Sequence, residues 1–380
     1  PQYWPPGPSG LEGSRRVTIL PSMRPTFDYS LAVRIAKFAI PLAIIGYLLW
    51  RIEPAQWHEL GAQEKNYGLL VAALLVALVA LSLSFARWCI LVRCQGIELT
   101  MLEAFRLGAI SFLLSFVSAG SVGGDLFKAV FLARRRPGKR VAAVASVFID
   151  RACGLYALTV LVAVGLLLAN PVDRSDGAIG LGQIKLATAA LFVAGTSVLA
   201  ILVFGGKQVD RWITAQGDSG LLGNVLSRIA PPLRMFHAHT FALTAAIVMS
   251  VGVQGLLAVS VYLIASGLYD SPPTLLEHIV IVPIGMLASA LPITPAGIGV
   301  FEVAIESLYR VVPRIETDAS GTLVALAFEI VKVVMAVIGM VFYWTANAEV
   351  RESLEAAELE AAEEESPTTP DLNRSSPVLD

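Results

Sequence analysis

Long apolar segments separated by short polar loops dominate the chain from about residue 30 onward. A helix needs roughly 20 mostly apolar residues to cross a hydrocarbon core about 30 Å thick. Segments that meet or approach this length cover residues 34–50, 67–92, 141–169, 184–205, 240–268 and 320–345. The pattern therefore predicts an all-α polytopic membrane protein with about six spanning helices.

Two further apolar regions, residues 103–133 and 275–310, are each interrupted by a stretch rich in Gly, Pro, Ser and Thr. In both, an apolar arm is followed by the breaking residues and then by an amphipathic arm that opens with an acid, Asp125 or Glu302. Irregular backbone cannot face lipid, because its polar groups would lack hydrogen-bond partners. We therefore predict two helical hairpins whose turns are buried in protein or line a wet cavity.

Paired broken helices inserted from opposite faces are typical of inverted-repeat transporters, in which they mark a binding site near the bilayer midplane. The N-terminus of a helix in such a cavity suits a phosphate or carboxylate group. The alternative is structural: Asp125 caps the helix after Gly124, and the glycines only permit close packing of helices.

Lysines and arginines predict the topology, because the basic residues of short loops stay on the cytoplasmic side. They collect at residues 134–140 and in the loop 206–239, whereas the loops 51–66 and 170–183 are mainly acidic. This distribution places both termini in the cytoplasm. It also makes the two hairpins enter from opposite faces if they are re-entrant. Loop charge does not distinguish that arrangement from one in which every hairpin arm crosses the membrane.

Composition narrows the function classes. The chain is 56% hydrophobic and 15% charged, with a net charge of -2, whereas soluble domains average about 25% charged. Its basic residues flank expected membrane spans, which excludes nucleic-acid binding. Cys89, Cys94 and Cys153 lie in or beside apolar segments and are interpreted as small apolar residues. The histidines fall in expected loops or at segment ends and are interpreted as surface residues, so neither a metal site nor a cofactor is predicted.

Polar ends flank the membrane domain. Residues 1–29 begin with many prolines and glycines and are predicted to be a disordered leader, with Met23 as an alternative start. Residues 30–346 form the membrane domain. Residues 347–380 begin as an Ala/Glu-rich helical extension and continue as an acidic, solvated tail.

Ionisable residues inside expected spans are costly unless they are paired or functional. Asp150 and Arg151 lie about nine residues into their segment, hence roughly 14 Å deep. Neighbouring helical positions point about 100° apart, so each of these two residues needs a partner on another segment. Glu329 and Lys332 lie three residues apart and can neutralise each other on one helix face.

Two motifs, in this order, resemble those of a known family. Residues 120–158 contain Gly-Gly-Asp, a basic loop and an Asp-Arg-x-x-Gly sequence that begins at Asp150. Residues 291–309 read LPITPAGIGVFEVAIESLY and contain Pro-x-x-Pro-x-Gly-x-Gly-x-x-Glu. Both stretches are similar to signatures of the membrane domain of lysylphosphatidylglycerol synthases, also called the flippase-like family.

The resemblance implies a protein of a bacterial cytoplasmic membrane that binds or moves a lipid, or lipid-linked substrate, with an anionic head group. The substrate-binding positions that it implies are Gly123, Gly124, Asp125, Asp150, Arg151, Pro292, Pro295, Gly297, Gly299 and Glu302. Secondary candidates are Lys128, Glu329 and Lys332. Synthases of that family continue into a soluble aminoacyl-transfer domain, whereas only 35 residues, 346–380, follow the last expected span. Lysyl transfer by this chain alone is therefore not expected.

Two other functions stay open beside a flippase. One is a non-transporting membrane partner that recruits a separate lipid-modifying enzyme. The other is a membrane enzyme that acts on lipid or polyprenyl phosphates, with Asp125 or Glu302 as the acid/base. The enzyme is the weaker alternative, because the sequence offers no nucleophile–base pair.

The topology can be tested by labelling from outside the cell. Cysteines placed at positions 137 and 175, after the three native cysteines have been replaced, should react from opposite sides of the membrane, because the first lies in the basic loop and the second in an acidic loop. An impermeant thiol reagent should label only position 175 in intact cells. Labelling of both positions under these conditions would contradict the topology.

Overall fold

The computed structural model contains two units, residues 1–39 and residues 40–380. All of the residues that it describes belong to the second unit, and they are 61, 64–117, 122–136, 138–169, 181–204, 235, 236, 238–290, 297, 299–315 and 317–345. The expected leader, the expected span 34–50 and the tail 347–380 lie outside the described residues.

Five helices in the described part of the chain are long and apolar enough to cross a membrane. They are α3 (Tyr67–Cys94), α6 (Arg140–Ala169), α7 (Leu181–Phe204), α10 (Thr240–Leu268) and α13 (Gly321–Trp344). With 24 to 30 residues each, they are roughly 36 to 45 Å long. Their bounds agree within three residues with five of the six predicted spans. The chain is thus a multi-pass membrane protein.

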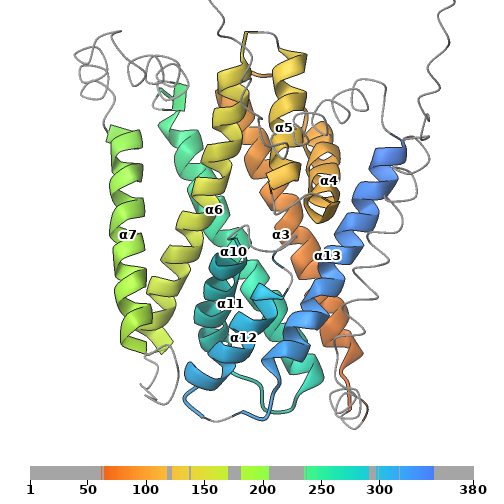
Figure 1. Cartoon of the computed structure of the whole chain (residues 1–380), viewed down its shortest axis with the longest axis vertical. Helices are drawn as coiled ribbons and strands as arrows, with labels where there is room; N and C mark the ends of the chain where they lie inside the picture. Colours follow the sequence, from red (N-terminus) through yellow and green to blue (C-terminus); the bar gives the residue numbers. More distant parts are fainter. Residues whose placement is uncertain are drawn as a thin grey trace, which may run out of the picture. The chain divides into compact units, whose positions relative to one another are not determined.

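Four shorter helices form two packed pairs. One pair is α4 (Met101–Val117) with α5 (Val122–Arg135), and the other is α11 (Leu275–Ser289) with α12 (Val300–Val311). The first pair lies in the upper half of the bundle and the second in the lower half (Figure 1). Both predicted helix breaks are therefore present. With 12 to 17 residues, each arm is only about 18 to 26 Å long, and the re-entrant orientation stays a prediction.

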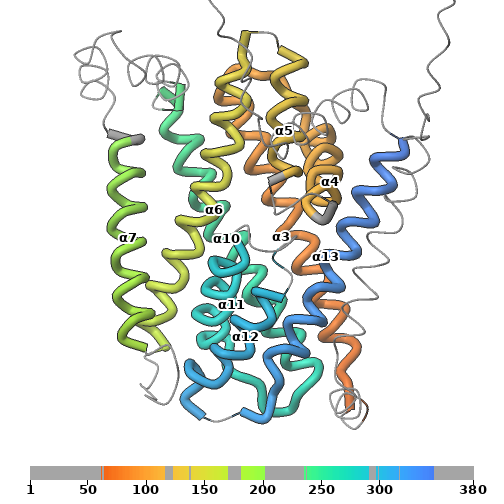
Figure 2. Tube along the Cα trace, viewed as in Figure 1, coloured from red at the N-terminus to blue at the C-terminus, as the bar shows by residue number. Residues whose placement is uncertain are grey.

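The order of long and short helices occurs twice along the chain, which can be followed in Figure 2. Helices α3 to α6 are long, short, short and long, and helices α10 to α13 repeat this order, with α7 between the two sets. Packing between the sets is reciprocal: α4 packs on α13, α11 packs on α6, and α3 packs on α10. Each short pair is thus held partly by the other set of helices.

The first helix of each short pair begins with a capping box, in which a Thr and a Glu three residues later satisfy each other's backbone N–H. Thr100 N–H donates to Glu103 at 2.8 Å, and Glu103 N–H donates to the Thr100 hydroxyl at 3.2 Å. Thr274 and Glu277 make the same bonds at 2.7 and 3.4 Å. The sequence therefore starts α4 and α11 by the same local device.

The capping glutamates also tie each pair together at its outer end. The second carboxylate oxygen of Glu103 accepts a hydrogen bond of 2.9 Å from Arg135, at the end of α5. The second oxygen of Glu277 accepts one of 2.8 Å from the backbone N–H of Arg314, just beyond α12. One carboxylate in each pair thus joins the start of the first arm to the end of the second.

Glycines allow α4 to lie against the backbones of both its neighbours. A Cβ added to Gly339 of α13 would overlap the carbonyl oxygen of Ala109, and one added to Gly124 of α5 would overlap that of Ser111. Overlap of this kind is typical of membrane helix interfaces, where small residues permit close approach. Helix α4 is therefore held between α5 and α13.

The interpretation of His278 as a surface residue is wrong, whereas that of the three cysteines as small apolar residues is confirmed. His278, expected at the surface, is fully buried in α11, where its ring nitrogens lie 2.7 Å from the Tyr309 hydroxyl and 3.0 Å from the Thr274 carbonyl oxygen. Those two partners satisfy the ring and remove the cost of burying it. The cysteines are free and buried, as expected of small apolar residues.

Substitution of Gly339 tests the packing of α4 on α13. Gly339→Ala should destabilise the protein by about 1 to 3 kcal/mol through overpacking and lower its thermal unfolding midpoint in detergent. Gly252→Ala is the matched control, because Gly252 is an exposed glycine inside α10 whose added Cβ would meet nothing within 4 Å. It should be neutral or raise the midpoint, since alanine favours a helix by about 0.5 to 1 kcal/mol over glycine. Equal midpoints for both variants would count against the contact.

Candidate functional site

A buried ion pair joins three of the long helices. The Arg87 guanidinium of α3 donates from Nε to Asp150 Oδ1 of α6 at 2.9 Å and from Nη1 to Ser250 Oγ of α10 at 2.7 Å. The Arg87 and Asp150 side chains are only 6% and 10% exposed. Gly154, one turn after Asp150, lies beside the guanidinium, and a Cβ added there would make only an ordinary contact of 3.7 Å with Arg87 Nη1. Asp150 is thus neutralised inside the bundle.

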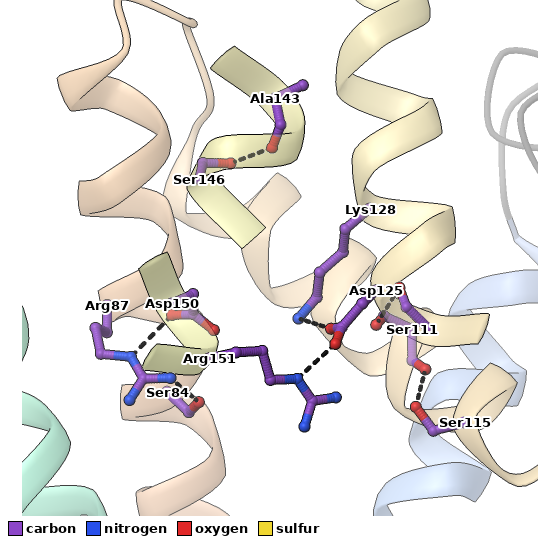
Figure 3. Close-up of polar contacts among 11 residues, drawn as sticks. Ser84, Arg87, Ser111, Ser115, Asp125, Lys128, Ala143, Ser146, Asp150 and Arg151 are labelled. Atoms are coloured by element: carbon purple, nitrogen blue, oxygen red, sulfur yellow. Dashed lines mark hydrogen bonds and ion pairs between the residues drawn. The ribbon is translucent and has the colours of Figure 1, made fainter. Parts of the chain in front are cut away.

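The next residue, Arg151, points toward a short helix (Figure 3). Its Nε donates to Asp125 Oδ2 of α5 at 2.5 Å, and its side chain is 47% exposed. On the other side of Asp125, Lys128 Nζ lies 4.0 Å from Oδ1 and 5.1 Å from the centre of the Trp88 ring. The prediction that Asp150 and Arg151 find partners on two different segments is confirmed.

These side chains form one group, which we call the first polar cluster and which consists of Arg87, Asp125, Lys128, Asp150 and Arg151. The Lys128 ammonium interacts electrostatically with each of the other four. Three cations stand against two carboxylates, so the cluster carries one excess positive charge when all are ionised. Arg151 is the most exposed of these five side chains, at 47%.

Local structure at the start of α5 sets the position of Asp125. The helix begins at Val122, so Asp125 lies in its first turn and does not cap a helix that starts after Gly124. The close helix packing that the structural alternative assigned to the glycines is confirmed at Gly124. The Ser111 hydroxyl of α4 donates to the Gly124 carbonyl oxygen at 2.7 Å, at the point where Gly124 approaches the α4 backbone. Gly123 is half-buried in the same turn. Gly124 thus brings the start of α5 against α4.

A second group of charges lies where α12 meets α13, and we call Glu302, Glu329 and Lys332 the second polar cluster. Lys332 Nζ donates to Glu329 Oε1 at 2.5 Å, which confirms their predicted neutralisation. Glu302 Oε2 accepts a hydrogen bond of 2.6 Å from the Gly299 N–H. Glu302 and Glu329 are close enough to interact electrostatically. Glu302, which the sequence groups with Arg151, therefore belongs with the last span.

The second helix break requires glycine at two positions. Gly297 has φ +73° and Gly299 has φ +89°, in the left-handed region that other residues rarely adopt. Pro292 and Pro295 lie outside the described residues. Gly299 also provides the N–H that Glu302 binds, so the turn and the acid are one local unit.

Arg87 is the main functional candidate that sequence reasoning missed. It lies in the apolar run SLSFARWCILVRC, and the cost of an ionisable residue within a span, which singled out Asp150, applies to it equally. Its pairing with a residue 63 positions away leaves no local spacing to detect. Within the described ranges, no group of three or more His, Cys, Asp or Glu residues could hold a metal ion.

Comparison with known families is decisive for the class of protein. The family described as "Lysylphosphatidylglycerol synthase TM region" matches residues 35–339. The chain belongs to this family. No curated protein and no solved structure matches this chain. Both polar clusters lie within the region that matches the family, and that region corresponds to the membrane part of these synthases rather than to a soluble catalytic domain.

Substitution of Arg87 and of Arg151, one at a time, should show which of the two arginines stabilises the fold. Arg87→Met should destabilise the fold by about 3 to 5 kcal/mol, because it leaves Asp150 buried without its cation. Arg151→Met should cost about 1 kcal/mol or less, because half-exposed pairs contribute little. The measurement is the midpoint of thermal unfolding, together with the yield of monodisperse protein in detergent.

A double variant provides the control for this prediction. Arg87→Met combined with Asp150→Leu removes both buried charges and should recover most of the lost stability, since apolar replacement of a buried pair is often neutral. If the double variant is no more stable than Arg87→Met, or if Arg151→Met is as damaging, the assignment of the buried pair as the structural one is wrong.

Proposed function

We propose that this protein binds a lipid, or lipid-linked substrate, through an anionic head group and moves it between the leaflets of a bacterial cytoplasmic membrane. The observation that carries the proposal is the half-exposed guanidinium of Arg151, in a cluster with one excess positive charge. An anion that reaches this guanidinium balances the cluster. Five candidate positions of the sequence, Gly123 to Asp125 with Asp150 and Arg151, contribute to this site.

A phosphate group fits the chemistry of Arg151. A guanidinium is planar and always charged, and its fork of N–H donors matches phosphate oxygens in pairs. Helix α5 begins beside it, so the positive end of the α5 dipole adds to the attraction for an anion. Asp125 lies in the same turn and competes for the guanidinium, which keeps Arg151 oriented when no head group is bound.

The repeated helix order supports movement rather than binding alone. Each set of four helices contains a short broken pair, and the capping boxes of α4 and α11 match. Inverted repeats with such pairs underlie alternating access around a central site. We infer that the pairs are re-entrant hairpins inserted from opposite faces, with Pro292, Pro295, Gly297 and Gly299 in the second turn. Both termini are then cytoplasmic.

Lipid movement can be measured in liposomes that contain the purified full-length chain. Fluorescent phosphatidylglycerol in the inner leaflet should become accessible to an external quencher faster than in protein-free liposomes, and faster than zwitterionic phosphatidylcholine. Arg151→Lys keeps the charge but loses the paired donors, so the rate should fall about tenfold, equivalent to roughly 1.4 kcal/mol. Arg310→Lys is the control, because Arg310 is 77% exposed and pairs only along α12 with Glu306 in the described contacts.

A charge swap distinguishes a binding cation from a scaffold. Arg151→Asp combined with Asp125→Arg recreates the ion pair with its members exchanged. Because the guanidinium then projects from another helix, transport should stay low although the protein folds. Full activity of the swapped protein would contradict the head-group role. Binding of phosphatidylglycerol without any movement would contradict transport and favour a membrane partner of a separate enzyme.

A further inference from the structure

The second polar cluster carries an unbalanced negative charge inside the protein. Glu302 is 3% exposed and Glu329 2% exposed, and the Lys332 side chain is 17% exposed. Two carboxylates stand against one ammonium, so the cluster has a net charge of -1 when all three are ionised. Two buried carboxylates that share one site repel each other, and ionisation of both is costly. Among the residues that the structure describes, no second cation balances the cluster.

One oxygen in this cluster has no partner. Glu302 uses Oε2 to cap α12 through the Gly299 N–H. Its Oε1 is buried and has no hydrogen bond to any residue that the structure describes. A buried carboxylate oxygen without a donor is costly, whereas a protonated carboxyl is itself a donor as well as an acceptor. This orphaned oxygen is an independent indication that the cluster takes up a cation.

The first polar cluster shows what is missing from the second. Its acids on α5 and α6 are balanced by Arg87 of α3 and by Lys128, three residues after Asp125. Helix α10 occupies the place of α3 in the second set of helices, and it contains neither lysine nor arginine. The residue three positions after Glu302 is Ile305, which is fully buried. Helix α10 and the first turns of α12 thus offer no counterpart of Arg87 or Lys128.

The neighbourhood favours a proton over a metal cation. Phe301 and Phe328 pack together beside the cluster, and Lys332 Nζ lies 5.2 Å from the Phe301 ring, so these neighbours supply no oxygen ligands. The other titratable groups on α11 and α12 are engaged near the far end of α12: Glu277 with Arg314, His278 with Tyr309, and Glu306 with Arg310 and Thr322. Glu329 and Lys332 are the charged residues of α13, and Glu329 interacts electrostatically with both Glu302 and Lys332.

We propose that Glu302 and Glu329 share one exchangeable proton, which makes the second polar cluster a proton-binding site. On loading, one carboxylate takes a proton from water and the cluster changes from a net charge of -1 to neutral; on release, the proton returns to water. A site that binds a proton on one side of the membrane and releases it on the other can drive substrate movement. That coupling rests on the proposed function, whereas proton binding itself does not.

Infrared difference spectroscopy tests proton binding without any lipid assay. The full-length protein in nanodiscs is cycled between acidic and alkaline buffer, and the C=O band of protonated carboxyl groups is followed. A band from a buried carboxyl should appear on acidification in the wild type. It should be lost in Glu302→Gln and in Glu329→Gln, because removal of either acid ends the repulsion that retains the shared proton. Glutamine at position 302 can still cap α12.

Glu306→Gln is the matched control, because Glu306 lies one turn further along α12 and is bonded to Arg310 and Thr322; it should keep the band. Absence of the band in the wild type, or its persistence in Glu302→Gln, would overturn the proposal. So would a band that is lost when sodium replaces potassium in the buffer, since the carboxylates would then bind the metal cation in place of the proton.

A pH gradient across liposomes tests the coupling separately. Phosphatidylglycerol movement by the wild type should accelerate several-fold when a gradient is imposed, and Glu302→Gln should not respond to the gradient. If the rate of phosphatidylglycerol movement by the wild type does not change when the gradient is imposed, the coupling is overturned and the proposed function is left intact. No lipid movement in the wild type, with a normal infrared band, would overturn the proposed function and leave the proton site intact.

Discussion

The bond between Arg87 and Asp150 fixes the register of the helices on which the rest of the site depends. Either charge would cost several kcal/mol if it faced hydrocarbon or stood alone inside the bundle. Helices α3 and α6 are therefore held at the register where the ion pair forms. Ser250 of α10 bonds the same guanidinium. Once Asp150 faces α3, the geometry of a helix turns its neighbour Arg151 about 100° away, toward α5. A structural ion pair thereby presents a second, half-exposed cation at the start of a short helix.

The two polar clusters are variations on one plan with opposite charge. In each, an acid in the first turn of the second short helix lies near a charged residue of the long helix that follows it, Asp125 near Arg151 and Glu302 near Glu329. The first cluster has a surplus cation and the second a surplus carboxylate. We propose that a lipid phosphate balances the first cluster and a proton the second, so that a single architecture serves both a substrate and an ion.

Much of the architecture could be predicted from sequence, because the membrane imposes length and apolarity on each span. The five described spans and both helix breaks follow from that rule. The local pairing of Glu329 with Lys332 followed from a spacing of three residues. Contacts between distant segments had no such signal: Arg87 bonds a residue 63 positions away, and one of the two partners of the buried His278 ring is Tyr309, 31 positions away. Glu302 and Arg151 were both expected at the substrate site, whereas packing brings Glu302 near Glu329 of α13.

The contact between Gly124 and Ser111 has a mechanical consequence. The two backbones are in direct contact at Gly124, and the Ser111 hydroxyl bonds the Gly124 carbonyl oxygen. A sliding movement of α4 along α5 would therefore break this hydrogen bond and the close backbone contact. Glu103 and Arg135 clamp the outer end of the same pair. The pair therefore behaves as a rigid lever, and any displacement of Asp125 has to be accommodated by bending in the segments before Met101 and after Arg135.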